Sequence, residues 1–308
     1  VSWWASPSIW PLTLASRLRC PTSVWTSYAN PRGVLLNRDN TLLYVHNAFD
    51  ANITTIRTRD LAIIDRLPIS TLDLPSDVLI GTRLFYSATD PRMSRDGWMS
   101  CANCHFDGMS DGRTWQGFWE GPRNTPTLYG LAETAPYTWS GGWDELADLE
   151  IKIRRLQGGV GLTDLLLPNP PQDSPHSGLS PDLDALVGYL NTLSPPGALT
   201  TPADQVDLVA RGAEVFETLE CATCHTPPTF TNQQPADVGT GGGAGERTDG
   251  IYDTPSLRWV ALSAPYFHDG RVGSLGDVFA QPGVHQLVGT VSQADIDALI
   301  LYLNTLPE

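Results

Sequence analysis

Two segments of the chain repeat one pattern of hydrophobic and polar positions. Leu183–Leu193 reads Leu-Asp-Ala-Leu-Val-Gly-Tyr-Leu-Asn-Thr-Leu, and Ile296–Leu306 reads Ile-Asp-Ala-Leu-Ile-Leu-Tyr-Leu-Asn-Thr-Leu. Apolar residues at positions i, i+3, i+4 and i+7 form one face of an α-helix. The pattern therefore predicts two amphipathic helices, each closing one of two similar halves.

Each closing helix has a counterpart earlier in its half. Gly81–Phe85 and Gly212–Phe216 share a Gly-x-x-x-Phe pattern within helical stretches. Because glycine has no side chain, it permits the opening helix to cross the closing helix closely. Ser194-Pro-Pro-Gly197 is typical of a linker and separates the halves.

The repeat continues between these helices. Arg123–Leu128 pairs with Tyr252–Leu257, and Ala135–Gly141 pairs with Ala264–Gly270 through a shared Ala-Pro-Tyr start and Gly end. The chain from about residue 77 onward is therefore a tandem duplication.

The preceding segment has a different period. Asn30–Leu36 and Asn40–Asn47 alternate as strands around the turn at residues 37–40, and further strands are expected at Ile53–Arg57 and Ala62–Leu67. The stretch Asn-Arg-Asp-Asn-Thr-Leu-Leu-Tyr-Val-His-Asn resembles one blade of a YVTN-type β-propeller. Because one blade cannot close a propeller, the resemblance implies a propeller-completing partner or a longer parent chain.

The candidate chemistry lies in a repeated pentapeptide. Cys101-Ala-Asn-Cys104-His105 recurs as Cys221-Ala-Thr-Cys224-His225, 120 residues later. Two thiols three positions apart can join the two vinyl groups of one haem, and the adjoining histidine then ligates the iron. The repeat predicts two covalently attached haem c groups.

A zinc ribbon and a redox dithiol are the alternatives to haem. Zinc ribbons place their CxxC pairs about 15 to 20 residues apart and need no histidine after either pair. Both repeats here carry that histidine and are much farther apart. The spacing therefore favours haem.

The combined pattern predicts a mainly α fold with three parts. Residues 1–75 form the β-rich, propeller-blade-like segment, residues 76–197 the first haem domain and residues 198–308 the second. Crossing helices around CxxCH resemble the class I cytochrome c fold.

Charge and cysteine usage narrow the partners and the compartment. The 308-residue chain has 19 Lys and Arg against 34 Asp and Glu, giving a net charge of −15. This charge argues against nucleic acid and suits basic redox partner proteins. No apolar run approaches the roughly 20 residues of a transmembrane helix. Only Cys20 lies outside the pentapeptides.

The tandem halves, with Ala-Pro-Tyr-Phe-His-Asp-Gly in the second, resemble the bacterial di-haem cytochrome c peroxidase and MauG family over about residues 77–308. The resemblance implies a tryptophan between the haems, at Trp139 by position. It also implies a peroxidatic first haem with a distal Glu and Gln. The expected spacing of that pair is missing, and Glu150 or Gln157 could fill the role only from another geometry.

The resemblance also implies sixth ligands for the irons. His285 occupies the place of the axial ligand of the second haem, and His176 lies in the corresponding loop of the first half. His268 is expected to hydrogen-bond near a propionate or between the halves. The family often carries a structural calcium, for which Asp107, Asp111, Asp144 and Asp148 are candidates without a diagnostic spacing.

The sequence supports three hypotheses about the function. The first is an exported di-haem cytochrome for electron transfer, located in the periplasm or outside the cell, because c-type haem is attached there in this family; its signal peptide is absent from this chain. The second is a peroxide-reducing or MauG-like oxidoreductase. The third is a structural subunit of an extracellular cytochrome assembly. The glycine-rich stretch 239–245 lacks the ending of a P-loop and is interpreted as a linker.

Overall fold

The structure is a computed structural model that describes residues 30–165, 174–195 and 201–306. The chain divides into two compact units, Val1–Leu74 and Pro75–Glu308. The predicted mainly α class is only partly right, because helices coexist with an antiparallel sheet in the first unit and many short turns in the second. Cys20 lies outside the described residues.

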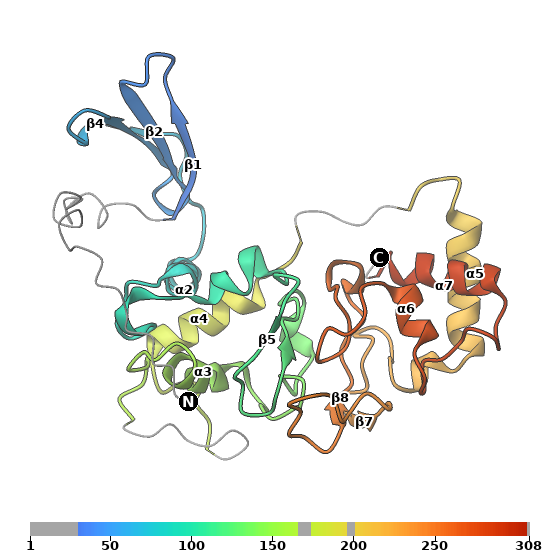
Figure 1. The fold of residues 1–308 in the computed structure, drawn as a ribbon. Helices are drawn as coiled ribbons and strands as arrows, with labels where there is room; N and C mark the ends of the chain where they lie inside the picture. The colour runs from blue at the N-terminus through green and yellow to red at the C-terminus, as the bar shows by residue number, and fades with distance from the viewer. Residues whose placement is uncertain (1–29, 166–173, 196–200, 307–308) are drawn as a thin grey trace, which may run out of the picture. The chain divides into compact units, whose positions relative to one another are not determined.

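The first unit contains a four-stranded antiparallel sheet (Figure 1). Its strands follow in chain order: β1 (Pro31–Leu36), β2 (Leu42–Asn47), β3 (Asn52–Arg57) and β4 (Ala62–Pro68). The predicted turn between β1 and β2 forms because Asn37 Oδ1 accepts from the amides of Thr41 and Leu42, at 2.8 and 3.1 Å. The sheet matches the four predicted strands, while the propeller relationship stays a prediction.

Helix pairs form the centre of each half of the second unit. α2 (Ser76–Tyr86) packs against α4 (Pro181–Asn191), and α5 (Val206–Thr218) packs against α7 (Gln293–Leu303) (Figure 1). A Cβ atom at Gly81 would lie 2.0 Å from the carbonyl oxygen of Ala185. One at Gly212 would lie 2.1 Å from that of Ala298. The predicted close crossing through glycine is thus present in both halves.

The closing helices begin at serine caps. Ser180 Oγ accepts from the amide of Leu183, with Pro181 in the first turn, and Ser292 Oγ accepts from the amide of Asp295. Both helices therefore start and end two or three residues earlier than the hydrophobic pattern alone predicts.

Shorter elements connect the helix pairs. They are α3 (Glu150–Arg155), α6 (Leu275–Ala280), two strand pairs and a series of single 3-10 turns. The strand pairs are β5 (Thr114–Trp115) with β6 (Arg123–Asn124), and β7 (Pro235–Asp237) with β8 (Ile251–Asp253). The 3-10 turns are η1 (Ala48–Asp50), η2 (Arg95–Gly97), η3 (Cys101–Asn103), η4 (Phe106–Gly108), η5 (Leu131–Glu133), η6 (Leu146–Leu149), η7 (Cys221–Thr223) and η8 (Val260–Leu262).

Each half has its own hydrophobic core. Phe85, Leu183 and Leu186 belong to the first, and Phe216 and Leu299 to the second. The predicted boundary between residues 197 and 198 falls in an undescribed stretch and stays a prediction. None of the helices in the described ranges is long and apolar enough to cross a membrane.

Candidate haem-binding sites

Both CxxCH pentapeptides fold as one tight helical turn. η3 begins at Cys101, η7 begins at Cys221, and in each case the amide of the histidine donates to the carbonyl of the first cysteine at 2.9 Å. Residues three apart in a helical turn lie on the same side. The local backbone therefore presents both thiols of each pair in one direction, as attachment to one porphyrin requires.

The two proximal histidines are oriented in the same way. His105 Nδ1 lies 3.1 Å from the carbonyl of Pro126, and His225 Nδ1 lies 3.2 Å from the carbonyl of Phe230. A carbonyl only accepts, so Nδ1 carries the hydrogen and Nε2 keeps its lone pair. A backbone carbonyl that fixes the tautomer is the usual support of a metal-bound histidine.

Burial keeps both imidazoles neutral. It lowers the pKa of His105 to about 4 and that of His225 to about 4, because desolvation disfavours the charged ring. At neutral pH each ring is therefore able to bind a metal without first losing a proton.

The thiols do not resemble a reactive dithiol. Burial raises the pKa of Cys101 to about 11 and that of Cys104 to about 11. Redox dithiols have lowered pKa values instead. The raised pKa values of Cys101 and Cys104 therefore argue against a reactive dithiol at the first pentapeptide.

A cavity of about 360 Å³ opens next to the first pentapeptide. Its wall includes Cys101, Cys104 and His105, together with apolar and aromatic side chains of the first half and a few residues of the second, among them Asp253 and Arg258. Such a size and such an apolar lining are typical of cofactor sites. The first haem would thus sit where the two halves meet.

The second pentapeptide faces another histidine. The ring centroids of His225 and His285 are 6.4 Å apart, with an angle of 40° between the rings. Burial lowers the pKa of His285, and Phe267 lies beside it at 6.1 Å between ring centroids. Two neutral imidazoles therefore approach each other across a gap that could hold one metal ion.

Comparison with known proteins points to a di-haem family. The family described as "Di-haem cytochrome c peroxidase" matches residues 75–154. The MauG protein of Methylorubrum extorquens is 30% identical over 239 residues, covering 65% of this chain and 67% of the relative. The cytochrome c551 peroxidase of Pseudomonas aeruginosa is 25% identical, covering 74% of this chain and 77% of the relative.

The chain belongs to the di-haem cytochrome c peroxidase and MauG family.

Other members and solved structures extend the match. The cytochrome c peroxidase Ccp of Escherichia coli is 27% identical, covering 76% of this chain but only 59% of that protein. The hydrazine synthase structure from Kuenenia stuttgartiensis has a TM-score of 0.57 at 25% identity and covers 77% of this chain and 89% of the other. A MauG-like protein associated with microbial copper homeostasis shares the fold, with a TM-score of 0.53, 20% identity, and coverage of 77% and 91%.

Trp139, placed between the haems by the family pattern, lines the cavity and links the two halves. Its indole Nε1 donates to the carbonyl of Asn124 at 2.9 Å, and its own carbonyl accepts from the amide of Asp253 at 3.0 Å. The indole is therefore held by a backbone group of the first half, and the backbone of Trp139 by one of the second half.

Glu150 does not line the cavity. It is fully buried, pairs with Arg154 at 2.7 Å and accepts from the amides of Leu162 and Thr163. These bonds use both carboxylate oxygens in fixing the loop after α3. The structure thus places Glu150 in a supporting network, whereas Gln157 does line the cavity.

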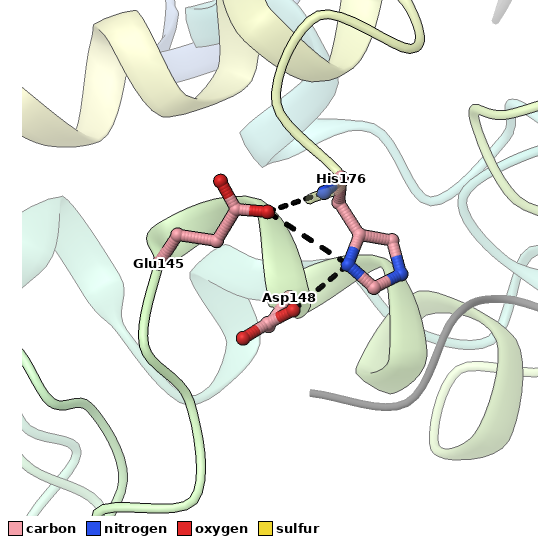
Figure 2. Close-up of side chains that lie close together, drawn as sticks. All are labelled: Glu145, Asp148 and His176. Atoms are coloured by element: carbon pink, nitrogen blue, oxygen red, sulfur yellow. Dashed lines mark hydrogen bonds and ion pairs between the residues drawn. The ribbon is translucent and has the colours of Figure 1, made fainter. Parts of the chain in front are cut away.

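His176 is also placed away from the cavity. It lies beside Asp148 and Glu145, with Nδ1 2.8 Å from Asp148 Oδ1 (Figure 2). It is absent from the described wall of the cavity at His105. This placement gives no support to the prediction that His176 ligates the first iron.

His268 hydrogen-bonds between the halves. Its Nε2 lies 2.9 Å from Glu246 Oε2 and 3.0 Å from the hydroxyl of Tyr252, while its carbonyl accepts from the amide of Asn124. Glu246 in turn pairs with the guanidinium of Arg123 at 2.8 Å. This buried network joins β6 of the first half to the loop after β7 of the second.

No three of the four calcium candidates share a metal site within the described ranges, although Asp144 lies near enough to Asp148 for their charges to repel. Asp107 accepts from Tyr86, Asp111 accepts from Trp115, and Asp148 faces His176. Within the described ranges, the one group of three or more potential metal ligands is Glu145, Asp148 and His176. A structural calcium stays a prediction.

Asp253 is a residue that sequence analysis missed. It lines the cavity, its Oδ1 has no hydrogen-bond partner among the described residues, and burial raises the pKa of its carboxyl group to about 7. The repeat could have pointed to this residue, because Asp253 occupies the position that Asn124 has in the first copy of the motif before Thr-Pro. An acid replacing an amide at one copy of a repeat points to a changed role.

Proposed function

We propose that this chain is an exported di-haem c-type cytochrome that transfers electrons, with bis-histidine ligation at its second haem. Cys101, Cys104 and His105 would hold the first haem, and Cys221, Cys224 and His225 the second. When bound, each haem supplies an iron that gains and loses one electron. The 6.4 Å spacing of the His225 and His285 rings carries the proposal.

The spacing fits one metal ion between the two rings. Metal–imidazole bonds are about 2 Å long, so two imidazoles on opposite sides of one metal have centroids about 6 Å apart. The observed 6.4 Å agrees with this value. Because a methionine ligand raises the potential of a haem and His285 replaces it here, we expect a low-potential second haem.

Trp139 would lie on the electron path. Its contacts with Asn124 and Asp253 fix it at the junction of the halves, and it lines the cavity of the first haem. The net charge of −15 favours basic redox partners in the periplasm or outside the cell.

The test is spectroscopy of the purified protein. Haem should stay with the polypeptide in acidified organic solvent, and EPR of the ferric protein should show a low-spin bis-imidazole signal for one haem. Haem that extracts freely would contradict covalent attachment. A protein lacking that low-spin signal would contradict ligation by His285.

Peroxide reduction at the first haem is the second candidate. In the described wall of its cavity, His105 is the sole histidine. The wall also includes Met99, and the proposal requires that its thioether does not ligate the iron. An iron with an open sixth position can bind a small oxidant, whereas a six-coordinate iron must first lose a ligand. Peroxide-dependent oxidation of a reduced c-type cytochrome would establish this activity, and its absence with an intact first haem would remove it.

A role in a larger extracellular assembly is the third candidate. β1 is exposed along its whole length, with Val34 and Leu35 71% and 68% accessible. An exposed apolar edge strand is a ready site for pairing with another strand. Mass measurement in solution tests the idea, because a strict monomer would count against it.

A further inference from the structure

Three metal-ligating side chains meet beside the first haem site without taking part in it. Glu145 precedes η6, Asp148 lies within η6, and His176 reaches them from the loop before α4 (Figure 2). One ligand atom from each lies within 4.8 Å of the others. His176 Nδ1 is 2.8 Å from Asp148 Oδ1 and 3.9 Å from Glu145 Oε1.

The cluster leaves buried polar atoms without hydrogen bonds. His176 is completely buried, and apart from the 2.8 Å contact of Nδ1 with Asp148 neither of its ring nitrogens has a hydrogen-bond partner in the described part of the chain. Asp148 is 1% exposed, and its Oδ2 also lacks one. Burying an imidazole or a carboxylate whose polar atoms lack hydrogen bonds costs free energy, unless a bound ion or water interacts with those atoms.

The charges in the cluster point to a cation. No Lys or Arg of the described residues forms an ion pair with Glu145 or Asp148. Glu145 is held in place by the backbone amides of His176 and Ser177 and by the hydroxyl of Ser177.

The equivalent positions of the second half form a helix cap. Glu145 and Asp148 lie four and seven residues after Gly141, and Ser274 and Asp277 lie at the same offsets from Gly270. There, Ser274 Oγ donates to Asp277 Oδ2 at 2.6 Å and caps α6. In the first half Glu145 stands at the position of this serine, and His176 lies beside the two carboxylates.

We propose that Glu145, Asp148 and His176 bind a divalent transition metal of the zinc class. Ligands about 2.0–2.2 Å from a tetrahedral metal lie about 3.3–3.6 Å from one another. The separations of His176 Nδ1 from Asp148 and Glu145, 2.8 and 3.9 Å, lie on either side of that range. A nitrogen ligand favours zinc-class metals over calcium and magnesium, which prefer oxygen. A fourth position would be filled by water.

The metal would fix the wall of the first haem site. Leu146 and Leu149 of η6 line the cavity, and His176 belongs to the loop that leads into α4. One ion would link η6 to the loop before α4 on the side away from the cavity. This role is structural and does not depend on the proposed electron transfer.

The test is metal analysis of the haem-loaded protein. After equilibrium dialysis against Zn²⁺ with excess Ca²⁺, mass spectrometry of the metals should find about one zinc per chain in addition to haem iron. His176→Gln and Asp148→Asn should each weaken zinc binding at least about 10-fold. The matched control is Asp277→Asn, which changes the equivalent acid of the second half and should leave zinc binding unchanged.

The haem spectrum reports folding of each variant. Wild-type protein without zinc, or with calcium in its place, would overturn the proposal. The proposal would also be overturned if both site variants, with intact haem spectra, bound zinc as tightly as the wild type. Because covalent haem is scored separately, failure of this proposal and failure of the proposed function are distinguishable.

Discussion

At the scale of single residues, the sites depend on which atom each side chain leaves free. His105 and His225 commit Nδ1 to backbone carbonyls, so their Nε2 atoms remain available. Among the described residues, His176 leaves Nε2 without a hydrogen bond while Nδ1 faces Asp148, and Asp253 leaves one oxygen. The hydrogen bonds that each side chain makes therefore indicate whether it can bind a metal or hold a proton, and the residue type alone does not.

The ligand assignment at the second haem predicts a shift in potential. His285→Met should raise the midpoint potential of one haem by on the order of 100 mV, because a thioether favours ferrous iron. Redox titration followed by absorbance measures the change. His46→Met in β2 is the matched control and should leave both potentials unchanged. Unaltered potentials in the His285 variant would exclude it as a ligand.

Asp253 predicts a pH dependence of stability. Burial raises its folded pKa to about 7 from 3.8, so the folded state holds a proton that the unfolded chain has already lost. Stability should therefore fall as the pH rises from about 4 to about 7.

Asp253→Asn should remove this loss, so the difference in Tm between variant and wild type should grow with pH across that window. Asn124 already occupies the equivalent position of the first half, so the amide is tolerated in this motif. Asp249→Asn, at an exposed position, is the control. A difference in Tm that is independent of pH would contradict the assignment.

At the scale of elements, helix crossing through glycine forms both halves. The carbonyl oxygens of Ala185 and Ala298 occupy the space where Cβ atoms of Gly81 and Gly212 would lie. Neither backbone can give way without moving a whole helix, because interiors are close-packed. The hydrophobic pattern predicted these helices, but their ends depended on the serine caps.

Gly212→Ala should therefore destabilise the protein by about 3 kcal/mol or more, since overpacking against a backbone carbonyl separates α5 from α7. Gly188→Ala in α4 is the matched control. No atom lies within 4 Å of a Cβ there, so it should stabilise by about 0.5–1 kcal/mol. Thermal unfolding of both variants measures the contrast, and equal effects would contradict the crossing geometry.

At the scale of the whole second unit, buried polar groups join the halves. Glu246 pairs with Arg123 and His268, and all three side chains are at most 7% exposed. Burial alone would raise the pKa of Glu246, but the Arg123 guanidinium and the hydrogen bonds from Thr248 and Arg247 lower it to about 2. The stretch 239–245, interpreted as a linker from its composition, leads directly into Glu246.

This network predicts acid sensitivity. The folded pKa of Glu246 lies below the unfolded 4.5, so its contribution is present above about pH 4.5 and is lost as the pH falls toward about 2. Glu246→Gln should destabilise by about 3 kcal/mol at neutral pH, because it leaves the buried Arg123 with only the longer, 3.7 Å ion pair to Glu120. It should also lose less stability on acidification than wild type.

Thermal melts over this pH range measure the effect. Glu214→Gln removes the partner of an exposed ion pair with Arg211 and should change stability by less than about 1 kcal/mol. An equal loss in the two variants would show that the network does not hold the halves together.

The sequence by itself determined what local spacing can encode. It identified the two CxxCH pentapeptides and predicted the tandem repeat, the amphipathic helices and the four strands, because thiol spacing, hydrophobic period and turn residues act within a few positions. It also named His285, through the family's pattern.

Only the tertiary structure decided which distant groups meet. It brought His285 to 6.4 Å from His225, moved Glu150 into a supporting ion pair and placed His176 with Glu145 and Asp148. It also buried Asp253 in the cavity wall. These outcomes depend on the packing of segments tens of residues apart, and a buried polar group takes its chemistry from the neighbours that packing supplies.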